Sequence, residues 1–127
     1  MKKIIDTENA PSAKWRAFSQ WVVANWFLYT AGQVAIDPKE WKFIWWDIVE
    51  QTHQVMKNLK AIIEASWSSM EQCIKCTIYL SNMDNYSLFN GVYAEYFDEK
   101  TAPARECIGI SELPLGAEVE ISLIAVV

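Results

Sequence analysis

The sequence predicts an α+β domain in which one mixed β-sheet carries two helices on the same face. Two stretches, residues 47–66 and 85–97, repeat apolar residues at the spacing of an amphipathic helix. Short runs rich in β-branched and apolar residues precede, separate and follow these stretches, as β-strands do. An order of strands, helix, strand, helix and strands packs most simply as a single sheet with both helices on one side.

Both helices have recognisable start signals. Asp47 is expected to cap the longer helix, and Glu50 follows three residues later as in a capping box. Asp84 is expected to cap the shorter helix. The expected apolar face contains Ile48, Thr52, Val55, Leu59 and Ile62 in the longer helix, and Leu88, Val92, Tyr93 and Tyr96 in the shorter one.

Strands are expected over residues 2–6, 18–24, 27–30, 33–36, 73–80, 104–110 and 118–127. Asn25 and Trp26 are expected to form a tight turn between the second and third strands, although such turns favour Asn-Gly. The last strand alternates polar and apolar residues, so one of its faces packs on the core. The sheet face away from the helices is also rich in apolar residues, which favours burial against another subunit.

Composition restricts the classes of function. The 127 residues fit one domain, 1–127, and the net charge is −5 with no cluster of Lys and Arg. Binding to a phosphate backbone depends on such a cluster, so nucleic acid is a poor candidate partner. No apolar run is long enough to cross a bilayer or to form a signal-peptide core, and the three cysteines suit a reducing compartment. We therefore expect a cytoplasmic protein that does not bind membranes.

Several segments match one known family in order along the chain. Residues 19–20 and 25–33 resemble its "SQ" and "NGFLYTSGQ" segments, residues 102–107 its "PARSCV" signature, and residues 112–114 and 119–126 its "RLP" and "VEIEAIAV" ending. On these segments the chain resembles the RidA (YjgF) family of imine deaminases. The resemblance implies a chorismate-mutase-like fold, a barrel-like homotrimer with ligand clefts between subunits, and no metal or organic cofactor.

The resemblance also implies a catalytic pair. Arg105 would hold the carboxylate of a small 2-imino acid, a task that suits the planar fork of a guanidinium. Glu120 would position the water that hydrolyses the C=N bond, and a carboxylate is able to orient a water and accept its proton. From pattern alone, both residues would be assigned to the solvent-exposed surface.

Five further residues are expected to line the substrate site by the same resemblance: Phe18, Ala31, Gly32, Asn90 and Cys107. Phe18 stands where the family commonly has Tyr, and Ala31 where it often has Ser, so two hydroxyl groups are missing. Each missing polar partner is expected to weaken recognition by about 1–3 kcal/mol. Cys107 is expected to act through its backbone carbonyl, with an inert buried thiol.

Cys73 and Cys76 have the spacing of a redox or zinc motif. On a regular strand, residues three apart point to opposite faces of the sheet. We therefore expect two packed thiols and neither a redox nor a zinc site.

The seven tryptophans are the most unusual feature, since the chain has only four glycines. In the family, glycine occupies the neighbourhoods of Trp26, Trp41, Trp46 and Trp67, the last at a helix C-terminus where glycine supplies a left-handed backbone. This pattern suggests deliberate redesign, in which tryptophans build a new protein–protein interface or reshape the pocket. The proposed interface set is Trp15, Trp21, Trp26, Trp41, Trp45, Trp46 and Trp67.

Two functions of different classes remain open. In the first, a homotrimer converts a small 2-imino acid to a 2-oxo acid and ammonia. In the second, Trp15, Arg16 and Phe18 fill the cleft, and the trimer is a non-enzymatic scaffold that assembles through its tryptophans. Ribonuclease activity, also attributed to the family, is the weakest candidate because the chain is acidic.

Overall fold

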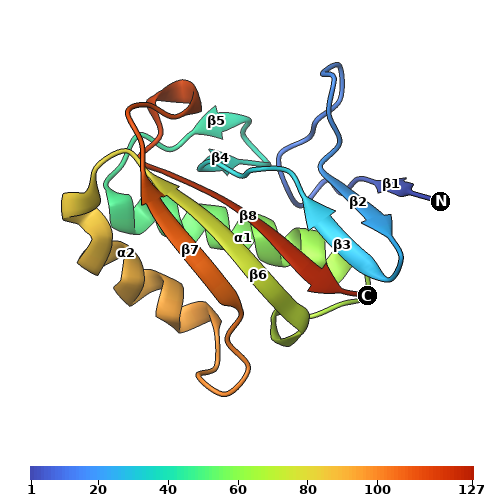
Figure 1. The fold of residues 1–127 in the computed structure, drawn as a ribbon. Coiled ribbons are helices and arrows are strands. Elements are labelled where there is room, and N and C mark those ends of the chain that lie inside the picture. The colour runs from blue at the N-terminus through green and yellow to red at the C-terminus, as the bar shows by residue number, and fades with distance from the viewer.

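The computed structural model describes all 127 residues and contains one six-stranded mixed sheet with two helices on one face, as the sequence predicts (Figure 1). The strand order is β1-β2-β3-β8-β6-β7, with β6 and β7 parallel and the other neighbours antiparallel. A separate hairpin pairs β4 with β5. The elements are β1 (Lys3–Ile5), β2 (Trp21–Ala24), β3 (Phe27–Thr30), β4 (Ile36–Asp37), β5 (Lys42–Phe43), α1 (Ile48–Ala65), β6 (Cys73–Leu80), α2 (Tyr86–Tyr93), β7 (Ala104–Gly109) and β8 (Val119–Val126), with short 3₁₀ turns η1 (Met70–Gln72), η2 (Met83–Asn85), η3 (Ala94–Tyr96) and η4 (Pro114–Gly116).

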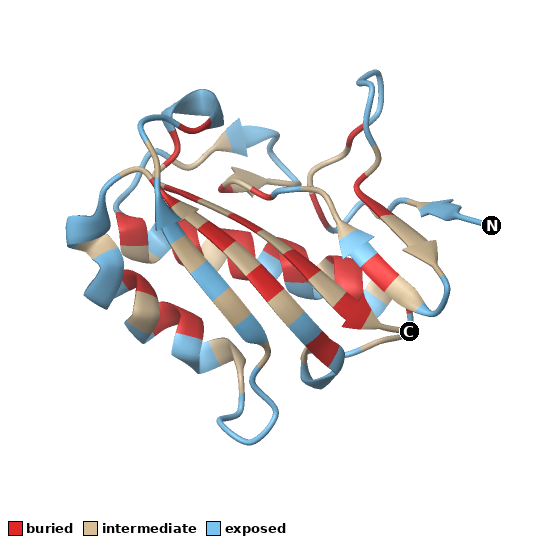
Figure 2. Ribbon diagram, viewed as in Figure 1, coloured by how far each residue is buried: buried red, intermediate tan, exposed pale blue.

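The core lies between α1 and the sheet, where Figure 2 shows buried positions alternating along β6 and β8. Asp47 caps α1 as predicted, because its Oδ1 accepts a hydrogen bond of 3.0 Å from the backbone N–H of Glu50. The predicted apolar stripe of α1 is buried against alternate residues of β8. These residues are Val119, Ile121, Leu123 and Ala125.

The second helix differs from its prediction at both ends. Asn82, not Asp84, accepts the capping hydrogen bond, because the chain first makes the 3₁₀ turn η2. The helix then ends at Tyr93 and tightens into η3. Val92 and Tyr93 are buried as predicted, but Leu88 is 56% exposed and Phe89, which was not assigned to this face, is fully buried.

Two predicted strands are also shorter or placed differently. The second strand begins at Trp21, and residues 18–20 belong to the preceding loop. Gln33 makes only an isolated bridge to Ile121. The chain then turns at residues 38–41, where the Asp37 carboxylate accepts hydrogen bonds from two backbone N–H groups, and the β4–β5 hairpin forms.

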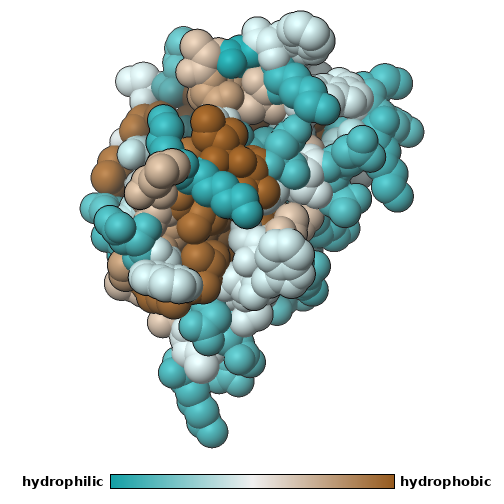
Figure 3. Space-filling view, turned by 90° about the vertical axis from the view of Figure 1, so that its right-hand side faces the viewer, coloured by the Kyte–Doolittle hydropathy of each residue, from teal (hydrophilic) through white to brown (hydrophobic).

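The sheet face opposite the helices carries an apolar row across its strands. The strand register places Ile4, Val22, Tyr29 and Ile124 side by side on that face. Figure 3 shows the side of the molecule where β1, β2 and β3 lie, and apolar side chains gather there in a patch surrounded by hydrophilic ones. No helix of the structure is both long and apolar enough to span a membrane.

Six tryptophans are exposed, with 58–101% of their surface accessible. Trp21 is the exception: it is fully buried in the core, so its inclusion in the proposed interface set is wrong. Trp15, Trp26, Trp41 and Trp67 have positive φ angles of 56–69°. The left-handed region costs an L-residue about 1–2 kcal/mol, because Cβ approaches the following carbonyl oxygen.

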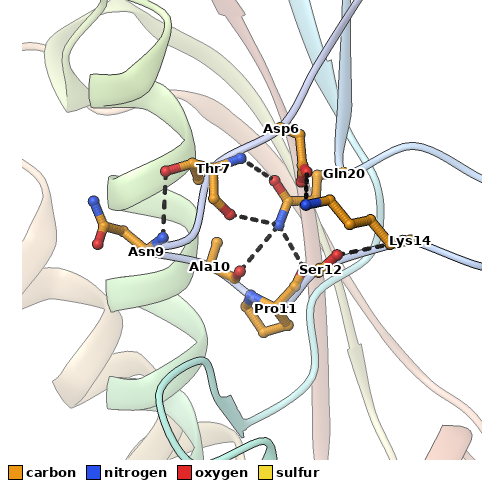
Figure 4. A network of polar contacts seen from close by, with 8 residues as sticks. All are labelled: Asp6, Thr7, Asn9, Ala10, Pro11, Ser12, Lys14 and Gln20. Atoms are coloured by element: carbon orange, nitrogen blue, oxygen red, sulfur yellow. Dashed lines mark hydrogen bonds and ion pairs between the residues drawn. The ribbon is translucent and has the colours of Figure 1, made fainter.

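The loop before β2 is held by one buried side chain, Gln20 (Figure 4). Its Oε1 accepts a 2.7 Å hydrogen bond from the backbone N–H of Thr7. Its Nε2 donates to the carbonyl oxygens of Thr7, Ala10 and Pro11 at 2.7–3.0 Å. Gln20 therefore fixes the path of the loop that carries Arg16 and Phe18.

Replacing Trp26 by Gly is expected to stabilise the protein by about 1 kcal/mol, because Asn25 and Trp26 both have positive φ in the hairpin turn and glycine adopts this conformation without steric cost. Urea denaturation measures the change. Trp46→Gly is the control, since Trp46 is exposed and has no positive φ. We expect it to be neutral or destabilising, and equal stabilisation by both variants would contradict the role of backbone strain.

Gln20→Glu is expected to destabilise the fold by about 3 kcal/mol or more, because a carboxylate would face three carbonyl oxygens with no donor. Gln72→Glu, at an exposed glutamine, is expected to change the unfolding free energy by less than about 0.5 kcal/mol. Equal unfolding midpoints for the two variants in urea would show that the Gln20 amide does not hold the loop.

Candidate functional site

A cavity of about 690 Å³ opens beside β8 and contains the Glu120 carboxylate. Its walls come from the loop before β2, the segment after β3, the β4–β5 hairpin and η4. The lining residues are Pro11, Ser12, Arg16, Phe18, Ala31, Gly32, Gln33, Val34, Ile36, Trp41, Phe43, Pro114, Leu115 and Glu120. The cavity is in the size range of small-molecule sites, about 300–1,000 Å³.

Glu120 points away from α1, because its neighbours Val119 and Ile121 on β8 face the core. It is half-buried and has no hydrogen bond or ion pair within the chain. Gly32 lies against it: a Cβ at that position would be 2.9 Å from Glu120 Cδ. The absence of a side chain at Gly32 therefore gives the carboxyl group its position, and burial raises the pKa of Glu120.

Arg105 lies on β7, at the edge of the sheet, and its side chain is directed towards α2. Its Nη2 donates to Tyr86 Oη at 3.0 Å and to Asn90 Oδ1 at 2.5 Å. The guanidinium carbon is also 4.8 Å from the ring centroid of Tyr93. These contacts orient the guanidinium and leave Nη1 and Nε free of hydrogen bonds within the chain.

The two catalytic candidates lie on opposite faces of the sheet within one chain. Arg105 is the register partner of the buried Cys76 on β6, whereas Glu120 is the partner of Tyr79 on the same strand. Residues 76 and 79 of β6 point to opposite faces, and so do their partners. One chain therefore does not bring Arg105 and Glu120 into a single cavity.

The other candidates divide between these two places. Phe18, Ala31 and Gly32 line the cavity of Glu120. Asn90 contacts Arg105 directly, and Cys107 follows Arg105 on the same face of β7. Cys107 is half-buried, and burial raises the pKa of its thiol.

The cavity also contains residues that sequence reasoning did not assign to a ligand site: Val34, Ile36, Phe43 and Leu115 among the apolar ones, and Gln33 among the polar ones. They come from segments far apart in the sequence, and only Gln33, at the end of the 25–33 segment, lies within a motif. The sequence predicts for Arg16 only that it fills the cleft, and for Trp41 that it forms an interface or reshapes the pocket. The φ of Leu115, +61°, shows how sharply η4 turns to bring this residue to the cavity.

The geometric argument against pairing Cys73 with Cys76 is wrong. A β-bulge between Cys73 and Lys75 places both cysteines on the core face, where their sulfur atoms are 3.7 Å apart. Both thiols are buried, and the hydrogen bond that Cys73 shares with Cys76, together with burial, raises the pKa of Cys73. The structure has no group of three or more His, Cys, Asp or Glu side chains that would hold a metal ion.

Comparison with known proteins identifies the fold and the family. The family model described as "Endoribonuclease L-PSP" matches residues 7–127. A RutC family protein of Pyrococcus horikoshii is 46% identical over 98% of each chain. Protein MMF1, mitochondrial, of Saccharomyces cerevisiae is 38% identical over 96% of this chain and 82% of its own length.

Solved structures agree with the sequence relatives. The Rid family protein YyfA of Yersinia pestis superposes with a TM-score of 0.96 at 40% identity and covers all of both chains. Escherichia coli TdcF, solved with bound serine, has a TM-score of 0.91 at 32% identity over 98% of each chain. These relatives and the fold give no support to the hypothesis of deliberate redesign. The chain belongs to the RidA/YjgF family.

Proposed function

We propose that this protein hydrolyses small 2-imino acids to 2-oxo acids and ammonia, in a site that two copies of the chain complete together. The observation that carries the proposal is the Glu120 carboxyl group, which lies unpaired in a largely apolar cavity with its pKa raised by burial. A carboxylate of raised pKa is a stronger base towards a bound water. The serine bound to TdcF, a small molecule with a carboxylate, is consistent with this class of ligand.

A second copy is needed because Arg105 and Glu120 face opposite sides of one sheet. The apolar row of Ile4, Val22, Tyr29 and Ile124 gives the chain a surface that is favourable to bury against another copy. We propose a homotrimer in which the Arg105 region of one copy meets the Glu120 cavity of the next. Each trimer then has three equivalent sites.

In the proposed reaction, the free Nη1 and Nε groups of Arg105 bind the substrate carboxylate, while Asn90 and Tyr86 hold Nη2. Glu120 accepts a proton from a water molecule as its oxygen attacks C2 of the protonated imine. Glu120 then returns this proton to the nitrogen of the amino alcohol, the C–N bond breaks as the C=O bond of the 2-oxo acid forms, and the hydroxyl proton leaves with ammonia as ammonium. Cys107 would contribute its backbone carbonyl near the imine nitrogen.

The chain lacks hydroxyl groups at Phe18 and Ala31, so the cavity wall there is apolar. The substrate is then recognised through its carboxylate and its imine, with less polar contact elsewhere. We place the activity in the cytoplasm, where the free cysteines Cys73, Cys76 and Cys107 stay reduced.

A second candidate function is a non-enzymatic trimeric scaffold. The observation that favours it is the exposure of six tryptophans, since aromatic residues are enriched in protein–protein contacts. Light scattering separates the two candidates, because this scaffold would form assemblies larger than a trimer. A plain trimer at micromolar concentration would contradict it.

Arg105→Ala is expected to lower kcat/KM for hydrolysis of freshly generated 2-iminobutanoate by about 100-fold or more, because the carboxylate loses its charged partner. Ammonia release above the spontaneous rate is the measurement. Arg16→Ala removes the guanidinium that lines the Glu120 cavity itself and serves as the matched control. Rates for Arg105→Ala equal to those of the wild type would remove the proposed role, and a loss confined to Arg16→Ala would place carboxylate binding within one chain.

Complementation between variants tests whether the site is shared. Arg105→Ala and Glu120→Gln chains are refolded together, so that random trimers contain sites with Arg105 from one chain and Glu120 from the other. Such sites make up about one quarter of the total in an equal mixture. Recovery of about that fraction of wild-type activity is expected, and a mixture as inactive as its parents would exclude a shared site.

Glu120→Gln is expected to stabilise the fold at neutral pH, because burial raises the pKa of Glu120 in the folded state. The folded chain binds this proton more tightly than the unfolded chain, so the wild type loses stability as pH rises through the interval between the two pKa values. The gap between variant and wild type should therefore close below about pH 4, near the unfolded value.

Urea denaturation at about pH 3.5–7.5 is the measurement, because this interval spans the usual carboxyl range and neutrality. Glu112→Gln, at an exposed glutamate outside the cavity, is the control and should not produce this pH-dependent gap. A Glu120→Gln protein that is less stable than the wild type at neutral pH would show that the carboxylate is stabilised by its surroundings.

A further inference from the structure

One wall of the Glu120 cavity is built from large apolar side chains. Phe18 comes from the loop before β2, Trp41 and Phe43 from the β4–β5 hairpin, and Leu115 from η4. Val34 and Ile36 extend the same wall on the segment after β3. This wall is more than a small imino acid needs, because a cavity of about 690 Å³ is large enough for a much bulkier ligand.

Trp45 packs against two of the segments that form this wall. Its ring packs edge-on against Phe43, with centroids 4.6 Å apart and planes at 75°. The same ring lies against Gly116, where a Cβ would be 3.6 Å from Trp45 Cζ3. Trp45 therefore connects the β4–β5 hairpin with η4, and it fixes Phe43 and Leu115 relative to each other.

Backbone contacts fix the hairpin itself. The N–H of Ile44 donates to the carbonyl oxygen of Ala35 at 2.7 Å, which fastens the end of β5 to the segment that contains Val34 and Ile36. Trp41 is in the turn of this hairpin, and its N–H donates to the carbonyl oxygen of Asp37 at 2.9 Å. These backbone hydrogen bonds therefore hold in place the segments that carry the apolar wall.

Once the polar groups of the site have bound the carboxylate and the imine, only one part of the substrate remains to contact the apolar wall. In the proposed reaction, the carboxylate binds Arg105 of a neighbouring copy, and C2 with its imine nitrogen lies at Glu120. The side chain is the only remaining part of a 2-imino acid. An apolar wall with three aromatic members favours an aromatic or branched side chain.

We propose that Trp41 and Phe43, braced by Trp45, select 2-imino acids with bulky apolar side chains, aromatic ones above all. This inference rests on the proposed function and names the substrate class of the same site. It also gives two of the exposed tryptophans, Trp41 and Trp45, a role in shaping the pocket.

The test compares Trp41→Gly with Trp67→Gly. Both residues are exposed and have positive φ, +58° and +56°, so glycine relieves the same backbone strain in each. Trp67 follows α1 and does not line the cavity, so it controls for the loss of a tryptophan and for added glycine. Both variants should unfold at urea concentrations no lower than the wild type, which separates a lost wall from misfolding.

The readout is kcat/KM for the imine derived from phenylalanine divided by that for 2-iminobutanoate, each generated by an amino acid oxidase. The wild type should favour the aromatic imine, and Trp41→Gly should lower the ratio about tenfold. Trp67→Gly should keep the wild-type ratio. A ratio unchanged in Trp41→Gly, or an equal loss for both imines, would overturn the proposal.

A binding measurement keeps this inference separate from the proposed function. Isothermal titration with the stable 2-oxo acids phenylpyruvate and 2-oxobutanoate does not require catalysis. If phenylpyruvate binds more tightly than 2-oxobutanoate, and Trp41→Gly reduces this difference, the role of the apolar wall is supported even when no imine is hydrolysed. A failure to hydrolyse any imine would remove the deaminase proposal alone. Equal affinity of the wild type for both acids would overturn the selection of bulky side chains.

Discussion

The alternation of side chains along β8 is the constraint on which the rest of the structure depends. This strand lies between β3 and β6, and Val119, Ile121, Leu123 and Ala125 fill the core beneath it. Because the period of a strand is two, this burial forces Glu120 to the other face. A slip of one residue would place a carboxylate in the core and four apolar side chains outside it. The position of Glu120 is therefore set by the packing of its neighbours, and Gly32 gives it room.

Strong local patterns were sufficient to predict most elements. The stripe of α1, its Asp47 cap and the alternation of β8 each depend on residues close in sequence, so their periods are visible without the fold. Long-range geometry was not visible in the same way. The bulge after Cys73 changes which face a cysteine occupies, and only the pairing with β8 reveals it. The division of Arg105 and Glu120 between two faces likewise depends on the register of both strands against β6.

The resemblance to a family supplied residue types but not their arrangement. It assigned Phe18, Ala31 and Gly32 to the same intersubunit site as Arg105; within one chain, these three lie around Glu120, and Arg105 lies on the opposite face of the sheet. Val34, Phe43 and Leu115 had no signal, because an apolar residue in a loop looks the same whether it lines a cavity or packs elsewhere. The loop that carries Phe18 depends on Gln20, whose buried amide satisfies backbone groups of residues 7–11. A lone polar residue before a strand does not reveal such a network.

The tryptophans show how a locally unfavourable choice can be tolerated. Four of them occupy a backbone region that favours glycine, and each costs about 1–2 kcal/mol there. A domain of this size has only about 5–15 kcal/mol of net stability, so this strain is a large fraction of it. Trp26 and Trp67 are 79% and 92% exposed, so burial of their side chains offsets little of the strain. At Trp41 the same conformation places an aromatic ring in the wall of the Glu120 cavity, and a ligand bound in that cavity would contact the ring and offset part of the cost. A ligand that binds in this cavity would stabilise the folded chain by more than its contacts with the other cavity residues predict. The reason is that the Trp41 ring is already held in the position in which it contacts the ligand.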